Sequence, residues 1–98
     1  MQATITHGES TVVKVIGRLD TVTSAELDEK LKNEAVTEDK MIIDFTGVEY
    51  ISSAGLRLLL SLKNRLGEEG KQLEIHNINA VVKEIFNVTG FINALTVK

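Results

Sequence analysis

The hydrophobic pattern changes period several times along the chain, and each change predicts a new element. Residues 2–17 alternate between apolar and polar positions, so that Val13 and Val15 share one face of an extended segment. Gly8 lies between two such runs, in a stretch whose composition favours a turn. The pattern therefore predicts an antiparallel β-hairpin at the start of the chain.

A helical period follows this hairpin. Leu27, Leu31 and Ala35 recur every four residues on an otherwise charged segment, which predicts an amphipathic helix with one apolar stripe. Thr23 and Glu26 have the spacing of a capping box, in which each side chain bonds the other residue's backbone N–H. We therefore expect Thr23 to cap this helix.

The middle of the chain contains a short apolar run and a long leucine-rich segment. Residues 40–45 lack alternation, which is typical of a strand covered on more than one side, and residues 46–50 read as a loop. A helix is expected from about Ser53 to Glu69, and Gly70 is expected to end it. Its inward face is predicted to consist of Leu56, Leu59, Leu60, Leu62 and Leu66, with Leu58 at the edge of this arc.

The last third repeats the alternation of strand and helix. Residues 71–77 predict a strand, and Asn79 is a suitable N-cap for a helix over residues 80–88. Gly90 is well placed as its left-handed C-terminal residue, and residues 92–98 are expected to form a final strand.

The predicted order is β-β-α-β-α-β-α-β. Strands that alternate with helices require parallel crossovers, whereas the first two strands form an antiparallel hairpin. The expected fold class is α/β: one mixed, mostly parallel sheet with helices packed mainly on one face. At 98 residues the chain fits a single domain spanning residues 1–98.

Composition narrows the classes of function. The net charge is -3 without a Lys/Arg cluster, which argues against direct nucleic-acid binding. There is no cysteine, and the two histidines, His7 and His76, are far apart, so neither thiol chemistry nor a metal site is expected, and no cofactor is implied. No apolar run could span a bilayer and no signal peptide is evident, so the expected location is the cytoplasm.

Two adjacent serines, Ser52 and Ser53, begin the leucine-rich helix. A serine there can cap the helix, act as a nucleophile, or accept a phosphate that faces the positive end of the helix dipole. The surrounding sequence is not a G-x-S-x-G elbow and has no nearby histidine, so an independent enzyme is not expected. Small Ala54 and Gly55 leave the hydroxyl and the backbone amides accessible, and both the capping role and the phosphoacceptor role remain open.

Three segments, in this order and spacing, carry a resemblance to a known family. They are "GRLD" at residues 17–20, "DFTGVEYISSAGL" at residues 44–56 and "IFNVTGF" at residues 85–91. Together they resemble the STAS domain of bacterial anti-sigma factor antagonists, and the likeness covers nearly the whole chain. The same family also includes accessory subunits of transport and signalling complexes.

The resemblance implies a partner-switching function. Such antagonists bind an anti-sigma factor that is also a protein-serine kinase, and thereby release a sigma factor. Phosphorylation of a serine at a helix N-terminus abolishes the binding, and a phosphatase restores it. By position, the phosphoacceptor is Ser53; Asp20 matches the acidic residue on the neighbouring loop, and Asp44 matches the polar residue that ends the preceding strand.

The match departs from the family pattern within the regulatory turn. Ser52 stands where relatives commonly have Asp, and Ala54 stands where they have a second hydroxyl residue. These departures motivate an alternative, a constitutive accessory subunit without a phosphoswitch. Gly55 and Leu58 are further candidate partner contacts, although Leu58 also fits an ordinary position at the core edge.

Overall fold

The fold is built around one five-stranded sheet. The computed structural model describes residues 1–98, with the elements β1 (Gln2–His7), β2 (Thr11–Leu19), α1 (Thr21–Lys32), β3 (Lys40–Ile51), α2 (Ser53–Glu68), β4 (Gln72–His76), α3 (Ala80–Thr89), α4 (Phe91–Ala94) and β5 (Thr96–Val97). The strands lie in the order β1-β2-β3-β4-β5. Only the β1–β2 pair is antiparallel, so the predicted α/β class, element order and mostly parallel sheet are confirmed.

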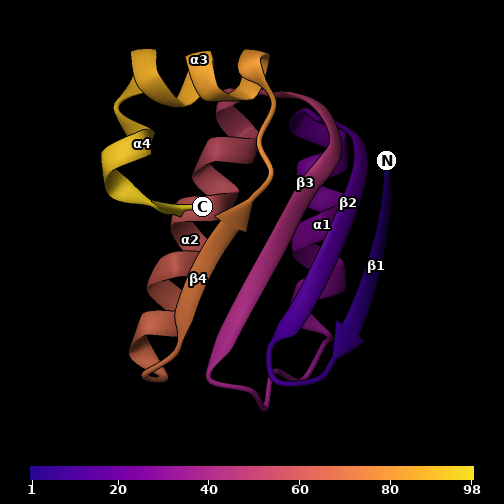
Figure 1. The fold of residues 1–98 in the computed structure, drawn as a ribbon. Coiled ribbons are helices and arrows are strands. Elements are labelled where there is room, and N and C mark those ends of the chain that lie inside the picture. The colour runs from indigo at the N-terminus through magenta and orange to yellow at the C-terminus, as the bar shows by residue number, and fades with distance from the viewer.

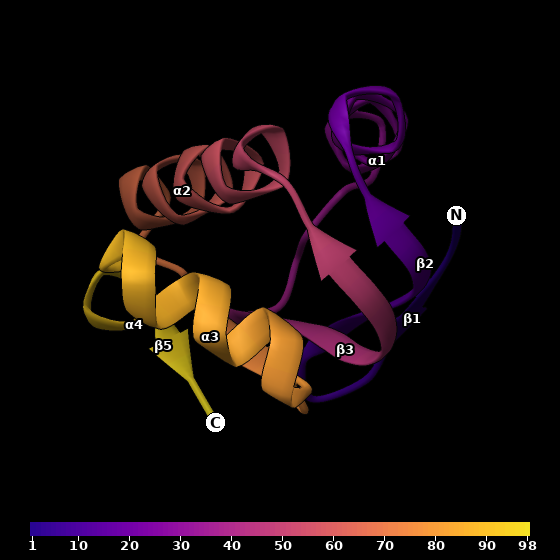
Figure 2. The same cartoon turned by 90° about the horizontal axis from the view of Figure 1, so that it is seen from above.

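The helices α1 and α2 lie side by side against one face of the sheet, while α3 and α4 gather near the β4–β5 edge (Figures 1 and 2). The core fills the space between these layers. It consists mainly of Leu, Ile and Val side chains, and Phe45 and Phe86 are the largest fully buried residues. The opposite face of β2 carries Lys14 and Ile16, which are exposed. This alternation is what a sheet covered chiefly on one face requires.

The start of α1 differs from the prediction. Asp20, not Thr23, is the N-cap, and its carboxylate accepts hydrogen bonds from the backbone N–H groups of Val22 and Thr23. Thr23 completes the capping box from the third helical position, because its hydroxyl accepts from the Asp20 N–H. The helix therefore begins three residues earlier than expected and ends at Lys32. Ala35, predicted on its apolar stripe, lies beyond its end and is exposed.

Strand β3 is twice as long as predicted, because residues 46–50 are strand and not loop. The ladder with β2 shifts register between the Lys14–Asp44 and Ile16–Gly47 pairs, which marks a β-bulge. Gly47 permits this close approach, since a Cβ there would lie 2.9 Å from the Ile16 Cγ1. The bulge interrupts the alternation on which the sequence pattern depended.

The structure agrees with most of the prediction for α2. Gly70 adopts φ 73° beyond its end, and the Lys71 N–H donates to the Leu66 carbonyl at 2.8 Å, which closes the last turn. The inward face differs at two positions: Leu58 is 6% exposed and Leu60 is 36% exposed. Leu58 is buried because α1 packs beside α2 and covers the edge of the arc.

The C-terminal segment is more helical than expected. Asn79 caps α3 by accepting from the Val82 N–H at 2.8 Å, and Gly90 adopts the left-handed conformation at φ 79°, as predicted. Residues 92–98 do not form one strand. Phe91–Ala94 is a short helix, α4, which leaves only Thr96–Val97 to pair with β4.

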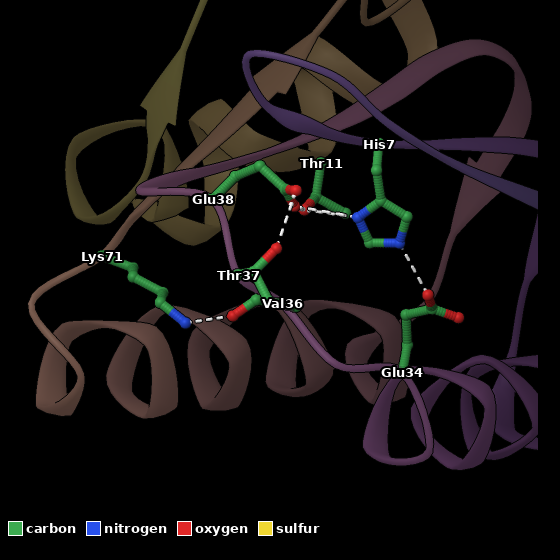
Figure 3. Close-up of polar contacts among 7 residues, drawn as sticks. All are labelled: His7, Thr11, Glu34, Val36, Thr37, Glu38 and Lys71. Carbon is green, nitrogen blue, oxygen red and sulfur yellow. Dashed lines mark hydrogen bonds and ion pairs between the residues drawn. The ribbon is translucent and has the colours of Figure 1, made fainter.

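A polar cluster (Figure 3) fixes the segment between α1 and β3, which lies at the lower end of the molecule in the view of Figure 1. His7 lies between two carboxylates, with its Nδ1 2.9 Å from Glu38 Oε1 and its Nε2 2.7 Å from Glu34 Oε2. The Thr11 hydroxyl also donates to Glu38, and Lys71 donates to the Val36 carbonyl. These contacts join the β1–β2 hairpin and the start of β4 to a segment without regular secondary structure.

This cluster predicts a pH dependence of stability. Hydrogen bonds with Glu38 and then Glu34 raise the pKa of His7 above 6.5, and hydrogen bonds from Thr11 and His7 lower the pKa of Glu38 from 4.5 to about 2. The His7 contribution is complete below its unfolded pKa and is lost as pH rises through the raised value. The Glu38 contribution is complete above its unfolded pKa and is lost as pH falls toward about 2.

We therefore expect the stabilisation by this cluster to be greatest between the two unfolded values, 4.5 and 6.5. The free energy of unfolding of wild type and His7→Gln, measured by urea denaturation, should differ more at pH 5.5 than at pH 9. An equal difference at both pH values would show that the charge on His7 does not stabilise the fold.

The first turn of α2 predicts a second stability effect. A Cβ on Gly55 would lie 2.6 Å from the Ile51 Cγ1 and 3.2 Å from the Leu19 Cβ, so Gly55→Ala should destabilise the protein by about 1–3 kcal/mol. Gly67 lies in the same helix, and a Cβ added there would meet no other atom within 4 Å. Gly67→Ala should therefore stabilise the protein by about 0.5–1 kcal/mol. Denaturant unfolding of both variants tests this contrast, which fails if Gly55→Ala is neutral.

Candidate functional site

The ends of β2 and β3 bring two helix N-termini together. Leu19 and Ile51, the last residues of these parallel strands, are register partners, and the Ser52 N–H donates to the Leu19 carbonyl at 2.8 Å. The next residue of each chain segment, Asp20 or Ser52, is the N-cap of the helix that follows. The starts of α1 and α2 therefore lie at the same end of the sheet (Figure 1), and their dipoles present positive ends there.

Ser52 and Ser53 have different roles in this turn. Ser52 is the N-cap, and its side chain accepts from the Gly55 N–H at a long 3.5 Å. Ser53 is the first helical residue; it is exposed, and its hydroxyl makes no hydrogen bond within the protein. The capping function thus belongs to Ser52, which leaves the Ser53 hydroxyl free.

The hydrogen bond between Ser52 and Leu19 places Asp20 beside the start of α2, residues 52–55, which we call the serine turn. The Asp20 carboxylate, however, already accepts hydrogen bonds from the start of α1. The backbone N–H of Thr23, the Thr23 hydroxyl and the Val22 N–H hold the pKa of Asp20 below its ordinary value. Asp20 is therefore ionised at neutral pH and serves the helix start. It contributes negative charge near Ser53 and is poorly suited to act as a general base.

The other candidates in the turn are less accessible than Ser53. Ala54 is half-buried, while Gly55 and Leu58 are buried. Gly55 is needed because the helix packs directly onto the strand ends, where a larger side chain would meet Ile51. The accessible polar group at the start of α2 is therefore the Ser53 hydroxyl.

Asp44 does not join this site. It was expected to end a strand, but β3 continues to Ile51, seven residues or roughly 20 Å further along the strand. Its carboxylate accepts from the Thr46 hydroxyl at 2.6 Å, the Thr46 N–H and the Asn77 side chain, and these bonds lower its pKa. Asn77 itself has φ 63°, so Asp44 stabilises the bulge and a left-handed turn after β4.

Arg57 is a feature of the site that the sequence analysis did not single out. It is exposed one helical turn after Ser53 and lines a groove of about 300 Å³ between α1 and α2. The signal was available in the sequence as a basic residue four positions after the candidate serine. A second arginine near this end, Arg18, lies 4.7 Å from the centroid of the Tyr50 ring.

The arrangement lacks the partners that serine catalysis needs. His7 ends β1 and is a register partner of Thr11, the first residue of β2, at the opposite end from Asp20. His76 is the register partner of Asp44 and bonds to Glu74 at 2.9 Å. No group of three or more His, Cys, Asp or Glu residues is arranged to hold a metal ion. None of the helices has the length and apolarity that crossing a membrane requires.

Comparison with known proteins agrees with this architecture. The family model described as "STAS domain" matches residues 1–98. An anti-sigma factor antagonist from Mycobacterium paratuberculosis has a similar structure, with a TM-score of 0.84 at 23% identity over 98% of this chain and 83% of that chain. The unphosphorylated form of the anti-sigma factor antagonist SpoIIAA gives a TM-score of 0.82 at 16% identity over 99% of this chain and 88% of that chain.

A curated relative is closer in sequence. The anti-sigma-B factor antagonist of Staphylococcus epidermidis is 34% identical over 89 residues, which are 89% of this chain and 82% of the relative. Antagonists of this kind are STAS proteins without enzymatic activity. Because the STAS model matches residues 1–98 and this antagonist is 34% identical over most of both chains, the chain belongs to the STAS-domain family of anti-sigma factor antagonists.

Proposed function

We propose that this protein binds an anti-sigma factor with serine kinase activity in the cytoplasm, and that phosphorylation of Ser53 abolishes the binding. In the unmodified state the protein occupies the anti-sigma factor and a sigma factor is released. A serine phosphatase returns the modified protein to the binding state. The proposal rests on family membership and on one structural observation, the exposed and unpaired Ser53 hydroxyl at the start of α2.

The chemistry of the switch is a phosphoryl transfer from ATP held by the kinase. The Ser53 Oγ attacks the γ-phosphorus, an O–P bond forms, and the bond to the oxygen bridging the β- and γ-phosphates breaks. ADP leaves, and the hydroxyl proton passes to a base on the kinase. The accessible position of Ser53 makes this possible without unfolding α2, because the hydroxyl is not needed as the helix cap.

The effect on binding follows from charge and solvation. A phosphate adds about -1.5 to -2 charges at a site where Asp20 is already ionised. If the partner covers the start of α2, the dianion must lose water and lie close to that carboxylate. Phosphorylation therefore weakens the complex while leaving the fold intact.

A second candidate function is a constitutive STAS subunit of a transport or signalling complex. Ser52 and Ala54, which replace the usual Asp and second hydroxyl of the regulatory turn, favour it. Affinity capture with the wild-type protein separates the two candidates. Retention of a serine kinase that releases the protein on addition of ATP supports the switch, and retention of a transport complex insensitive to ATP supports the alternative.

The first prediction for the switch concerns the site of modification. Incubation with the cognate anti-sigma kinase and ATP should add one phosphate to wild type and to Ser52→Ala, and none to Ser53→Ala. The reason is that only the Ser53 hydroxyl is free at the helix start. Intact-mass and peptide mass spectrometry measure the product; label on Ser52 or no label would overturn the phosphoswitch.

The second prediction concerns affinity. Ser53→Asp should weaken binding to the anti-sigma factor by about tenfold or more, because it places a fixed negative charge at the contact. Asn64→Asp adds the same charge at an exposed position further along α2 and should bind like wild type. Titration calorimetry measures both; unchanged affinity of Ser53→Asp would contradict electrostatic exclusion.

A further inference from the structure

Arg57 is the one arginine whose charge is not used by the fold. The chain has three arginines: Arg18 lies over the Tyr50 ring, and Arg65 bonds to Asp28 at 2.8 Å. Arg57 is exposed and forms neither a hydrogen bond nor an ion pair with any carboxylate of the chain. It is also the only charged residue in the first ten residues of α2, from 53 to 62.

The position of Arg57 directs it toward the serine turn. Ser53 and Arg57 are four residues apart on one helix, so they lie on the same face with Cβ atoms about 5–6 Å apart. Side chains on an α-helix lean toward its N-terminus, so the guanidinium of Arg57 is within reach of the turn that begins with Ser53. Its planar fork of N–H donors matches the oxygens of a phosphate.

The groove beside Arg57 contains a second polar group without a partner. Its α2 wall includes Ala54, Arg57 and Leu58, and its α1 wall includes Ser24. Ser24 is 4% exposed, and its hydroxyl makes no hydrogen bond within the protein. The carboxylate that lines the same groove, Asp28, is bonded to Arg65 and Lys32 and so does not neutralise Arg57.

We propose that Arg57 is the intramolecular counter-ion of a phosphate on Ser53, held at the mouth of the groove between α1 and α2. This inference rests on the proposed function, because it assigns a role to Arg57 only in the phosphorylated state. Before modification, the guanidinium is available at the surface beside the serine turn. After modification, the phosphate binds it, so phosphorylation changes two charges at the surface: it adds a dianion and withdraws a cation.

The pairing is tested without the kinase by incorporating phosphoserine at position 53 during translation. The second ionisation of the phosphate, ordinarily near pH 6, is followed by ³¹P NMR. In Arg57→Gln its measured pKa should rise by about half a unit, a roughly threefold change in the dissociation constant, because the dianion loses its counter-ion. Arg57→Lys should fall between wild type and Arg57→Gln, since it keeps the charge and loses the fork.

A matched control separates a local pairing from a change in net charge. Lys83→Gln removes one exposed positive charge from α3 and should leave the phosphate titration unchanged. The difference between wild type and Arg57→Gln should also diminish in 1 M salt. Because Arg57 is exposed, the unmodified Arg57→Gln protein should keep the wild-type thermal unfolding midpoint.

Identical phosphate titrations for wild type and Arg57→Gln would overturn the inference. This outcome is distinct from failure of the proposed function, which would appear as an absence of kinase modification at Ser53. The protein with phosphoserine incorporated at position 53 tests the role of Arg57 whether or not the kinase modifies Ser53. A shift of equal size in Lys83→Gln would also contradict the inference, because the effect would then reflect net charge alone.

Discussion

The parallel pairing of β2 with β3 is the constraint on which the rest of the molecule depends. It ends with Leu19 beside Ile51, and a backbone hydrogen bond from Ser52 to Leu19 carries the alignment one residue beyond the strands. Both segments then turn into helices, so α1 and α2 start together and run side by side. The absence of a side chain at Gly55 allows α2 to pack this closely onto the strand ends. The serine turn, the Asp20 cap and the groove between the helices all follow from this arrangement.

The two ends of the sheet serve different purposes. At the lower end, His7 and Glu38 fix the segment before β3 through charged hydrogen bonds, and this cluster contributes to stability. At the upper end, the groups near Ser53 are either engaged in capping, as Asp20 and Ser52 are, or free, as Arg57 is. A change in protonation at the lower end therefore acts on the fold, whereas the modification that we propose for Ser53 would act on the surface at the upper end.

Most of the fold was predictable because the chain carries clear local signals. The change from alternation to a helical period located the hairpin and α2, and Asn79, Gly70 and Gly90 marked helix ends by well-understood backbone chemistry. The failures occurred where tertiary contacts override such signals. The bulge at Gly47 hid the second half of β3, so Asp44 was placed at a strand end that lies seven residues further on. Leu60 was placed on the inward face but is 36% exposed, and Leu58, placed at the edge of the arc, is buried because α1 covers that edge. One helix considered alone does not show how its neighbour packs.

The candidate site was less predictable than the fold. The resemblance to known antagonists directed attention to Ser53, but only the geometry shows that Ser52 provides the cap and that the next hydroxyl is free. The same resemblance placed Asp20 beside the turn, and the structure gives the reason: Asp20 and Ser52 follow adjacent parallel strands. To recognise Arg57 as a free cation, one must know which other cations are already paired, and a sequence alone does not contain that information.

The neutral cap has a consequence for the switch that we propose at Ser53. A carboxylate in the place of Ser52 would give the start of α2 a permanent negative charge, against which an added phosphate is a change of degree. With a hydroxyl as cap, residues 52–55 carry no formal charge, so the proposed phosphate on Ser53 would be the first charge in this segment. In the proposed switch the helix start would therefore pass from uncharged to charged, although an uncharged cap interacts less favourably with the helix dipole than a carboxylate does.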